Sequence, residues 1–175
     1  MRVMLLAGLI AAFAQPVMAQ QARDWDILRD PAQRVIMAYT PFDNGLGIAV
    51  RCINRSYEAL ITGLPPTEYE TRPLDVAFGD RELREQTWNV AMESRVAVSS
   101  RPAEFARKLR EGGTLKVRVP GAAEGGRNLL YVLELPASSA AIDETLTACD
   151  RPLVDPRDAE IQDIGRNGLP GGVEG

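Results

Sequence analysis

Cys52 and Cys149 are the only cysteines in this chain of 175 residues, and the chain contains no histidine. The absence of histidine excludes Ser-His-Asp and Cys-His catalysis and removes the commonest side-chain ligand of transition metals. The two cysteines lie far apart in the sequence, without the short spacing of a zinc site or of a C-x-x-C redox motif. This pattern favours a structural disulfide over thiol chemistry, and we expect no metal and no cofactor.

A disulfide needs an oxidising compartment, and residues 1–19 predict one. Arg2 gives a short positive start, an apolar run follows over residues 3–13, and Val17-Met18-Ala19 forms a small-residue cleavage site. This pattern is typical of a secretory signal peptide, because the apolar run is too short to cross a bilayer. No later run approaches the roughly 18 apolar residues of a membrane-spanning helix. We therefore expect a periplasmic or secreted protein with no integral membrane segment after cleavage.

Length and charge narrow the class of protein further. The chain that remains after cleavage has the size of one domain, which we place at residues 20–149. Residues 150–175 are rich in proline, glycine and aspartate with little periodicity, so we expect a flexible C-terminal tail. The formal net charge is −4, whereas nucleic-acid binding needs a basic surface, so we expect no nucleic-acid partner.

Basic residues gather in one stretch of the sequence, on a predicted helix and on the strand that follows it. They are Arg101, Arg107, Lys108, Arg110, Lys116 and Arg118. Together these side chains could bind a phosphate, a carboxylate polymer or an acidic protein partner. The alternative is an ordinary solvated helix face, complemented by acidic neighbours such as Glu104 and Glu111.

Other candidate motifs give weaker signals. The glycine-rich segment Gly121–Arg127 joins two predicted strands, so it is a hairpin connection rather than a phosphate-binding loop, which needs a strand-loop-helix setting. A paired-carboxylate hydrolase would need two acidic side chains in a cleft. Acidic residues cluster around one turn, at Asp75, Asp80, Glu82 and Glu85. Nothing singles out a pair among them, and the sequence has no S-x-x-K, H-E-x-x-H or G-x-S-x-G motif.

The elements that must position these residues are mainly strands. From residue 32 to residue 135 the dominant period is two, and one predicted strand places Leu46, Ile48, Val50 and Cys52 on the same face. Asp43-Asn44-Gly45 predicts a tight turn between two strands. We therefore expect a mainly-β, antiparallel sandwich or barrel-like domain with two short α-helices. The alternative is an α+β domain with one antiparallel sheet covered by helices.

The two helices are predicted by their boundary residues and apolar stripes. The first begins near Pro102, buries Phe105 and Leu109 on one face, and ends at Gly112-Gly113. The second begins at Ser138 or Ser139, and its apolar stripe is Ile142, Leu146 and Cys149. A disulfide between Cys149 and Cys52 would therefore join the last helix to a strand of the sheet.

The order of several short motifs resembles a known family. Val50-Arg51-Cys52 ends a strand, Trp88 lies in another strand, Phe105–Leu109 is a helix of the pattern F-A-R-x-L, and Cys149 is the terminal cysteine. This order looks like the VasI or TagO family, periplasmic accessory proteins of bacterial type VI secretion, or a related bacterial periplasmic family. The resemblance covers about residues 23–149. The chain departs from the family pattern at residues 30–33 and in its extra tail.

These observations lead to an expected function. We expect a non-enzymatic periplasmic accessory or binding protein with a protein partner in the cell envelope, and the resemblance implies association with a secretion apparatus. An alternative is a periplasmic carrier of a small molecule or of an envelope polymer. A less favoured alternative is a histidine-free carboxylate hydrolase.

Overall fold

The computed structural model describes residues 24–91 and 94–157. These residues form one antiparallel sheet of nine strands with two α-helices and a short 3₁₀ turn. The strands are β1 (Asp26–Asp30), β2 (Val35–Pro41), β3 (Gly47–Ile53), β4 (Ser56–Thr62), β5 (Thr71–Phe78), β6 (Arg84–Ala91), β7 (Val96–Ser99), β8 (Gly113–Ala123) and β9 (Arg127–Leu135). The helices are α1 (Pro102–Leu109) and α2 (Ala140–Ala148), and the 3₁₀ turn is η1 (Glu124–Gly126). The predicted mainly-β, antiparallel class with two short helices is confirmed.

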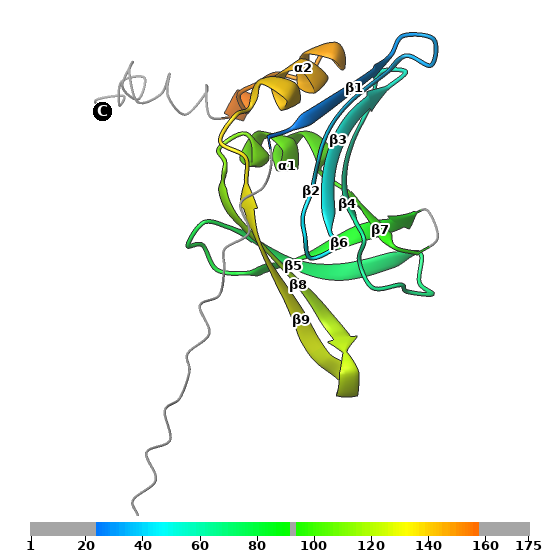
Figure 1. The fold of residues 1–175 in the computed structure, drawn as a ribbon, viewed down its shortest axis with the longest axis vertical. Coiled ribbons are helices and arrows are strands. Elements are labelled where there is room, and N and C mark those ends of the chain that lie inside the picture. Colours follow the sequence, from blue (N-terminus) through cyan, green and yellow to red (C-terminus); the bar gives the residue numbers. More distant parts are fainter. Residues whose placement is uncertain (1–23, 92–93, 158–175) are drawn as a thin grey trace, which may run out of the picture.

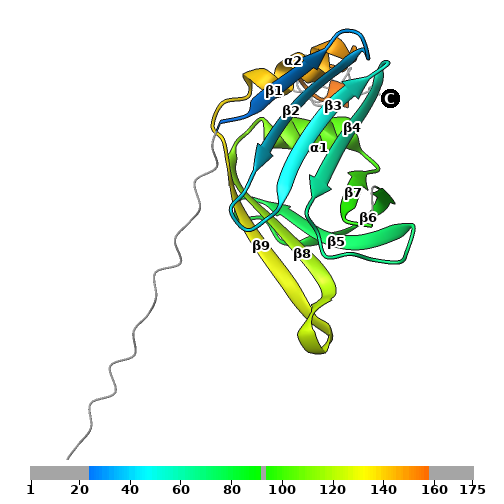
Figure 2. The same cartoon turned by 45° about the vertical axis from the view of Figure 1, so that its right-hand side comes forward.

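The sheet is open and curled, with α1 and α2 packed inside its curve (Figures 1 and 2). Its strand order is β1-β2-β3-β4-β7-β6-β5-β8-β9. The spatial order of β5, β6 and β7 in the sheet is therefore the reverse of their order in the sequence. As a result β7 pairs with β4, and β5 pairs with β8. Strands β1 and β9 form the two edges, and the β8–β9 hairpin projects from the body of the molecule (Figure 1).

The inner face of the sheet carries the core, as the alternation in the sequence predicts. In β3 the side chains of Ile48, Val50 and Cys52 are buried together on that face. The turn before β3 is confirmed, because the Phe42 N–H donates to the Leu46 carbonyl at 2.8 Å across it. The strand β1 was not predicted, since its sequence is mostly charged and lacks a clear apolar alternation.

Helix α1 covers the middle of the sheet with an apolar face. Phe105 and Leu109 are buried, and the Phe105 ring makes edge contacts with Trp88 and Phe78 at centroid distances of 5.1 and 5.5 Å. The predicted burial of Trp88 is confirmed, since it is 1 % exposed. The helix ends at Leu109 with Arg110 as its C-cap, earlier than the predicted end at Gly112-Gly113, and these two glycines adopt a positive φ where the chain passes into β8.

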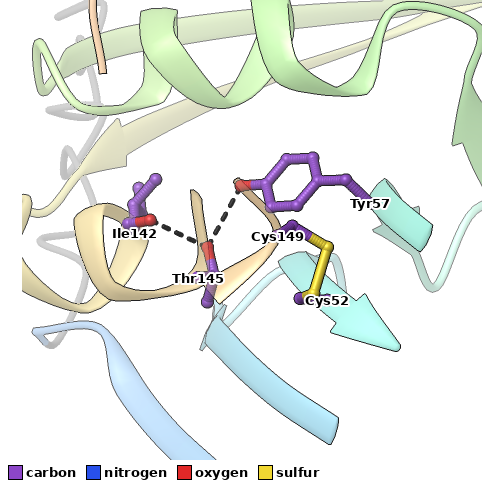
Figure 3. Close-up of a disulfide and its surroundings, with 5 residues drawn as sticks. All are labelled: Cys52, Tyr57, Ile142, Thr145 and Cys149. Atoms are coloured by element: carbon purple, nitrogen blue, oxygen red, sulfur yellow. Dashed lines mark hydrogen bonds between the residues drawn. A yellow bond between two sulfur atoms is a disulfide. The ribbon is translucent and has the colours of Figure 1, made fainter. Parts of the chain in front are cut away.

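A disulfide joins the C-terminal end of α2 to β3 (Figure 3). Cys52 and Cys149 are bonded with a Cα–Cα distance of 5.6 Å, which confirms the predicted pair. Beside the disulfide, the Tyr57 hydroxyl lies 3.1 Å from the Thr145 hydroxyl, and Thr145 donates to the Ile142 carbonyl. This buried set of contacts fixes α2 against β3 and β4.

The predicted signal peptide at residues 1–19 and most of the predicted tail lie outside the described residues. The first part of that tail, residues 150–157, packs beside the helices: the Arg151 N–H donates to the Leu146 carbonyl at 2.9 Å. Among the helices of residues 24–91 and 94–157, none combines the length and apolar character needed to cross a membrane.

Candidate functional site

The structure divides the six predicted basic residues between two faces of the sheet. In β8 the side chains of Leu115 and Val117 are fully buried in the core, so Lys116 and Arg118 lie on the outer face, away from α1. Arg118 forms an ion pair there with Asp75 of β5, with Nε and Oδ2 2.6 Å apart. The predicted cluster therefore does not form one continuous basic surface.

Two arginines of the α1 region hold the segment that follows α2. The Arg107 guanidinium lies 3.1 Å from an Asp155 carboxylate oxygen, and Arg110 donates to the Leu153 carbonyl at 2.7 Å. Arg110 also pairs with Asp143 of α2. Hydrogen bonds from Arg157 lower the pKa of Asp155 well below its usual range, with the nearby charge of Arg107 contributing. Arg107 and Arg110 therefore have structural partners within the chain.

The remaining two basic residues border a groove of about 870 Å³ between α1 and the β5–β6 hairpin. Arg101 stands at the start of α1 and Lys108 stands near its end. Ser99, Ser100 and Phe105 contribute to the same wall, and the opposite wall comes from the hairpin. We call this cavity the α1 groove. Eight of the residues that line it are charged.

Charges of both signs line the α1 groove. On α1, Glu104 lies between two cations: Lys108 donates to its carboxylate at 3.0 Å, and Arg101 lies 3.6 Å away. The hydrogen bond from Lys108 is the main reason that the pKa of Glu104 is lowered. From the hairpin, the charged lining residues are Asp80, Arg81, Glu82, Arg84 and Glu85.

This arrangement divides the predicted acidic cluster only in part. Glu85 lies directly opposite Asp75 in the β5–β6 pairing, whereas Asp80 and Glu82 belong to the turn that lines the α1 groove. Within the part of the chain that the structure describes, no group of three or more acidic or cysteine side chains is placed to hold a metal ion. The charged side chains that line the α1 groove suit it to binding through ion pairs and hydrogen bonds.

Sequence reasoning missed Arg81 and Arg84 as members of this site. Both follow Gly79-Asp80, which the alternation of β5 marks as the end of a strand. The available signal was therefore the turn itself, because charged residues in a hairpin turn project beyond the sheet. The local sequence pattern could not show that α1 lies opposite this turn in the folded protein.

A second cavity of about 620 Å³ lies at the other end of the molecule, beside the disulfide. Arg29, Arg34 and Arg55 line it, together with Cys52 and Ala148. Arg29 pairs with Glu144 of α2 through its Nε, at 2.6 Å.

Comparison of the chain with protein-family models, with curated proteins and with solved structures gives no match.

Proposed function

We propose that this protein is a non-enzymatic binding protein of the periplasm, and that the α1 groove binds a polypeptide segment of a cell-envelope partner. The observation that carries the proposal is the mixture of charges in a groove about 870 Å³ in volume. A folded or extended polypeptide presents both signs of charge together with backbone donors and acceptors. The groove offers complementary groups for each of these.

The same observation separates this proposal from the alternative of a polymer carrier. An anionic envelope polymer presents one sign of charge, so its carrier needs a continuous basic surface. Here Glu104, Glu82 and Glu85 stand among the cations of the groove. A polypeptide partner with alternating charges fits this surface better.

The predicted signal peptide and the disulfide Cys52–Cys149 support a periplasmic location, because structural disulfides persist in oxidising compartments. The resemblance to the VasI or TagO family supports a partner in the type VI secretion apparatus.

The test uses site-specific photo-crosslinking in cells that make the full-length chain. In one variant a photoreactive residue replaces Ser100 in the α1 groove. In a second variant of the same chain it replaces Leu130, which is 52 % exposed on the distant β8–β9 hairpin. We expect a discrete crosslink to a secretion-apparatus protein from position 100 and none from position 130. No crosslink from position 100 in secreting cells contradicts the proposal.

A charge-reversal variant identifies the contribution of the groove. Arg101→Glu with Lys108→Glu removes two cations of the groove, while the matched Arg55→Glu with Arg127→Glu alters two exposed cations elsewhere. We expect the first pair to abolish the crosslink and the second pair to leave it. Arg107 and Arg110 are unsuitable for this test, because they bind residues 153 and 155 within the chain.

A further inference from the structure

The cavity beside the disulfide is lined by more basic than acidic side chains. It has a volume of about 620 Å³, and we call it the disulfide cavity. Three of its lining residues are arginines, Arg29, Arg34 and Arg55, whereas Asp30 is its one acidic lining residue among those that the structure describes. This local excess of positive charge contrasts with the net charge of −4 of the whole chain.

One of the three arginines has a carboxylate partner within the chain. The Nε and Nη2 of Arg29 donate to the two carboxylate oxygens of Glu144, on α2. Among residues 24–91 and 94–157, the ion pairs of the structure involve neither Arg34 nor Arg55. Asp30 offsets the charge of only one of these two arginines, so the described lining of the cavity keeps an unbalanced positive charge.

Arg34 and Arg55 also occupy backbone positions that favour glycine. Arg34 is the last residue of the β1–β2 turn and has a φ of 54°, and Arg55 is the second residue of the two-residue β3–β4 turn and has a φ of 69°. A positive φ crowds the Cβ atom of an L-residue, and a two-residue turn of this kind is typically Asn-Gly. Here the pair is Asn54-Arg55. Residues other than glycine that are held at positive φ concentrate at functional sites.

The fold places these two turns side by side at one end of the sheet. Strands β2 and β3 pair in a register that sets Val35 opposite Ile53, and the Asn54 N–H donates to the Arg34 carbonyl at 3.2 Å. Both turns lie at the end of the sheet that carries α2 (Figures 1 and 2). Two arginines from separate hairpins therefore border the same cavity.

We propose that the disulfide cavity binds a small organic molecule that carries a phosphate or carboxylate group. Arg34 and Arg55 hold this group, because a guanidinium presents paired N–H donors that match two of its oxygens. Val35, Ile36 and Ala148 line another part of the cavity and accommodate an apolar part of the molecule. The volume lies in the range of small-molecule sites. The disulfide cavity shares no lining residue with the α1 groove, so this site does not rest on the proposed function.

A purely structural role for the two arginines makes a different prediction. Cations near the end of a helix can stabilise its last carbonyls. In α2, however, the carbonyls of Leu146 and Thr147 already accept hydrogen bonds from the backbone N–H groups of residues 149–151. If Arg34 and Arg55 nevertheless supported α2, replacing them with glycine would lower stability. Under the proposal, glycine relieves the crowding at positive φ, so stability stays the same or rises while anion binding weakens.

The experiment titrates the full chain, with its disulfide intact, with phenyl phosphate and separately with benzoate, at an ionic strength held constant with sodium chloride. Two-dimensional NMR follows the backbone amides, and benzyl alcohol is the uncharged control. We expect at least one anion to shift the amides of Asn54, Arg55 and Ala148 saturably, while benzyl alcohol leaves them unchanged and the amides of Ser100 and Lys108 in the α1 groove do not move. The anion that binds more tightly identifies the preferred group. No saturable shift at the first three amides with either anion, or an equal shift with benzyl alcohol, overturns the proposal.

Single variants test the two arginines directly. We expect Arg34→Gly and Arg55→Gly each to weaken anion binding at least about tenfold, the effect of losing roughly one charge-assisted hydrogen bond. Arg127→Gln removes one exposed arginine from the distant β8–β9 hairpin and keeps the wild-type anion affinity. Wild-type affinity in both glycine variants overturns the proposal. A lower denaturant midpoint in both glycine variants assigns the arginines to the support of α2 and overturns it as well.

The charge-reversal proteins separate this site from the α1 groove. We expect Arg55→Glu with Arg127→Glu to lose anion binding while it keeps the crosslink from position 100. Arg101→Glu with Lys108→Glu should lose the crosslink while it keeps anion binding. Loss of anion binding in this second protein would move the anion into the α1 groove and overturn the proposal.

Discussion

At the scale of single residues, Tyr57 couples the stability of the fold to pH. Its ring is 5 % exposed, and its hydroxyl lies beside Thr145 of α2 (Figure 3). Burial raises the pKa of this phenol to about 12, because the charged phenolate would lose its hydration. In the unfolded chain the pKa returns to its ordinary value near 10.

The direction of the pH effect follows from these two values. Between about pH 10 and pH 12 the unfolded chain loses the Tyr57 proton while the folded protein keeps it. Stability from this residue is therefore fully present below pH 10 and falls as the pH rises, by at most about 1.4 kcal/mol for each pH unit.

We expect Tyr57→Phe to be less sensitive to pH than the wild type over this window, although it loses the contact with Thr145. Denaturant unfolding at intervals from pH 8 to pH 11.5 measures the difference, and Tyr69→Phe is the control because Tyr69 is 77 % exposed. Parallel pH profiles for Tyr57→Phe and the wild type would show that the phenol does not titrate in this way.

At the scale of elements, the disulfide joins α2 to β3 over a sequence separation of 97 residues. In the chain-entropy model, closing a loop of this length destabilises the unfolded state by about 4–5 kcal/mol. We expect the double variant Cys52→Ala, Cys149→Ala to lose roughly that amount of unfolding free energy. Denaturant unfolding of the oxidised wild type and of the variant measures the loss.

A reduced wild-type sample is the control for the disulfide prediction, because it keeps both side chains and loses only the covalent bond. Reduction and double substitution are expected to lower stability by similar amounts. An unchanged midpoint on reduction would mean that the Tyr57–Thr145 contact and the apolar residues of α2 hold this helix by themselves.

The elements also show which features were predictable. The strand β3 and helix α1 followed from their periods of two and of about four, because each buries one face against a single core. The six basic residues were expected to form one group, since α1 and β8 are adjacent in the sequence. The reversal at Gly112-Gly113 places the polar face of β8 on the outer side of the sheet, which residue spacing does not reveal.

At the scale of the whole molecule, the order of the strands could not be predicted. Alternation indicates that a segment is a strand but gives no information about its neighbours, and β4 pairs with β7 rather than with β5. The disulfide could be predicted because the chain offers only one possible pair.

The whole molecule has two sheet edges, and the β9 edge carries exposed apolar residues. Leu130 and Val132 are 52 % and 50 % exposed on the outer face of the projecting hairpin. Lys116 lies opposite Val132 on β8. A lysine beside an open edge opposes pairing with another sheet, because association would bury its charge.

We expect Lys116→Val to increase self-association, since it extends the apolar surface and removes the charge. Sedimentation velocity over a range of protein concentrations measures the change, and Lys108→Ala on α1 is the control. A variant that stays monomeric at concentrations where the wild type is monomeric would show that Lys116 does not protect this edge.

The position of the disulfide also sets an order of events during synthesis. A chain emerges N-terminus first, so Cys52 becomes available long before Cys149, which follows the last residue of α2. The sequence contains no other thiol with which Cys52 could pair in the meantime. The disulfide can therefore form only after all the strands of the sheet have been synthesised. Its presence then indicates that the chain has been synthesised through the end of α2.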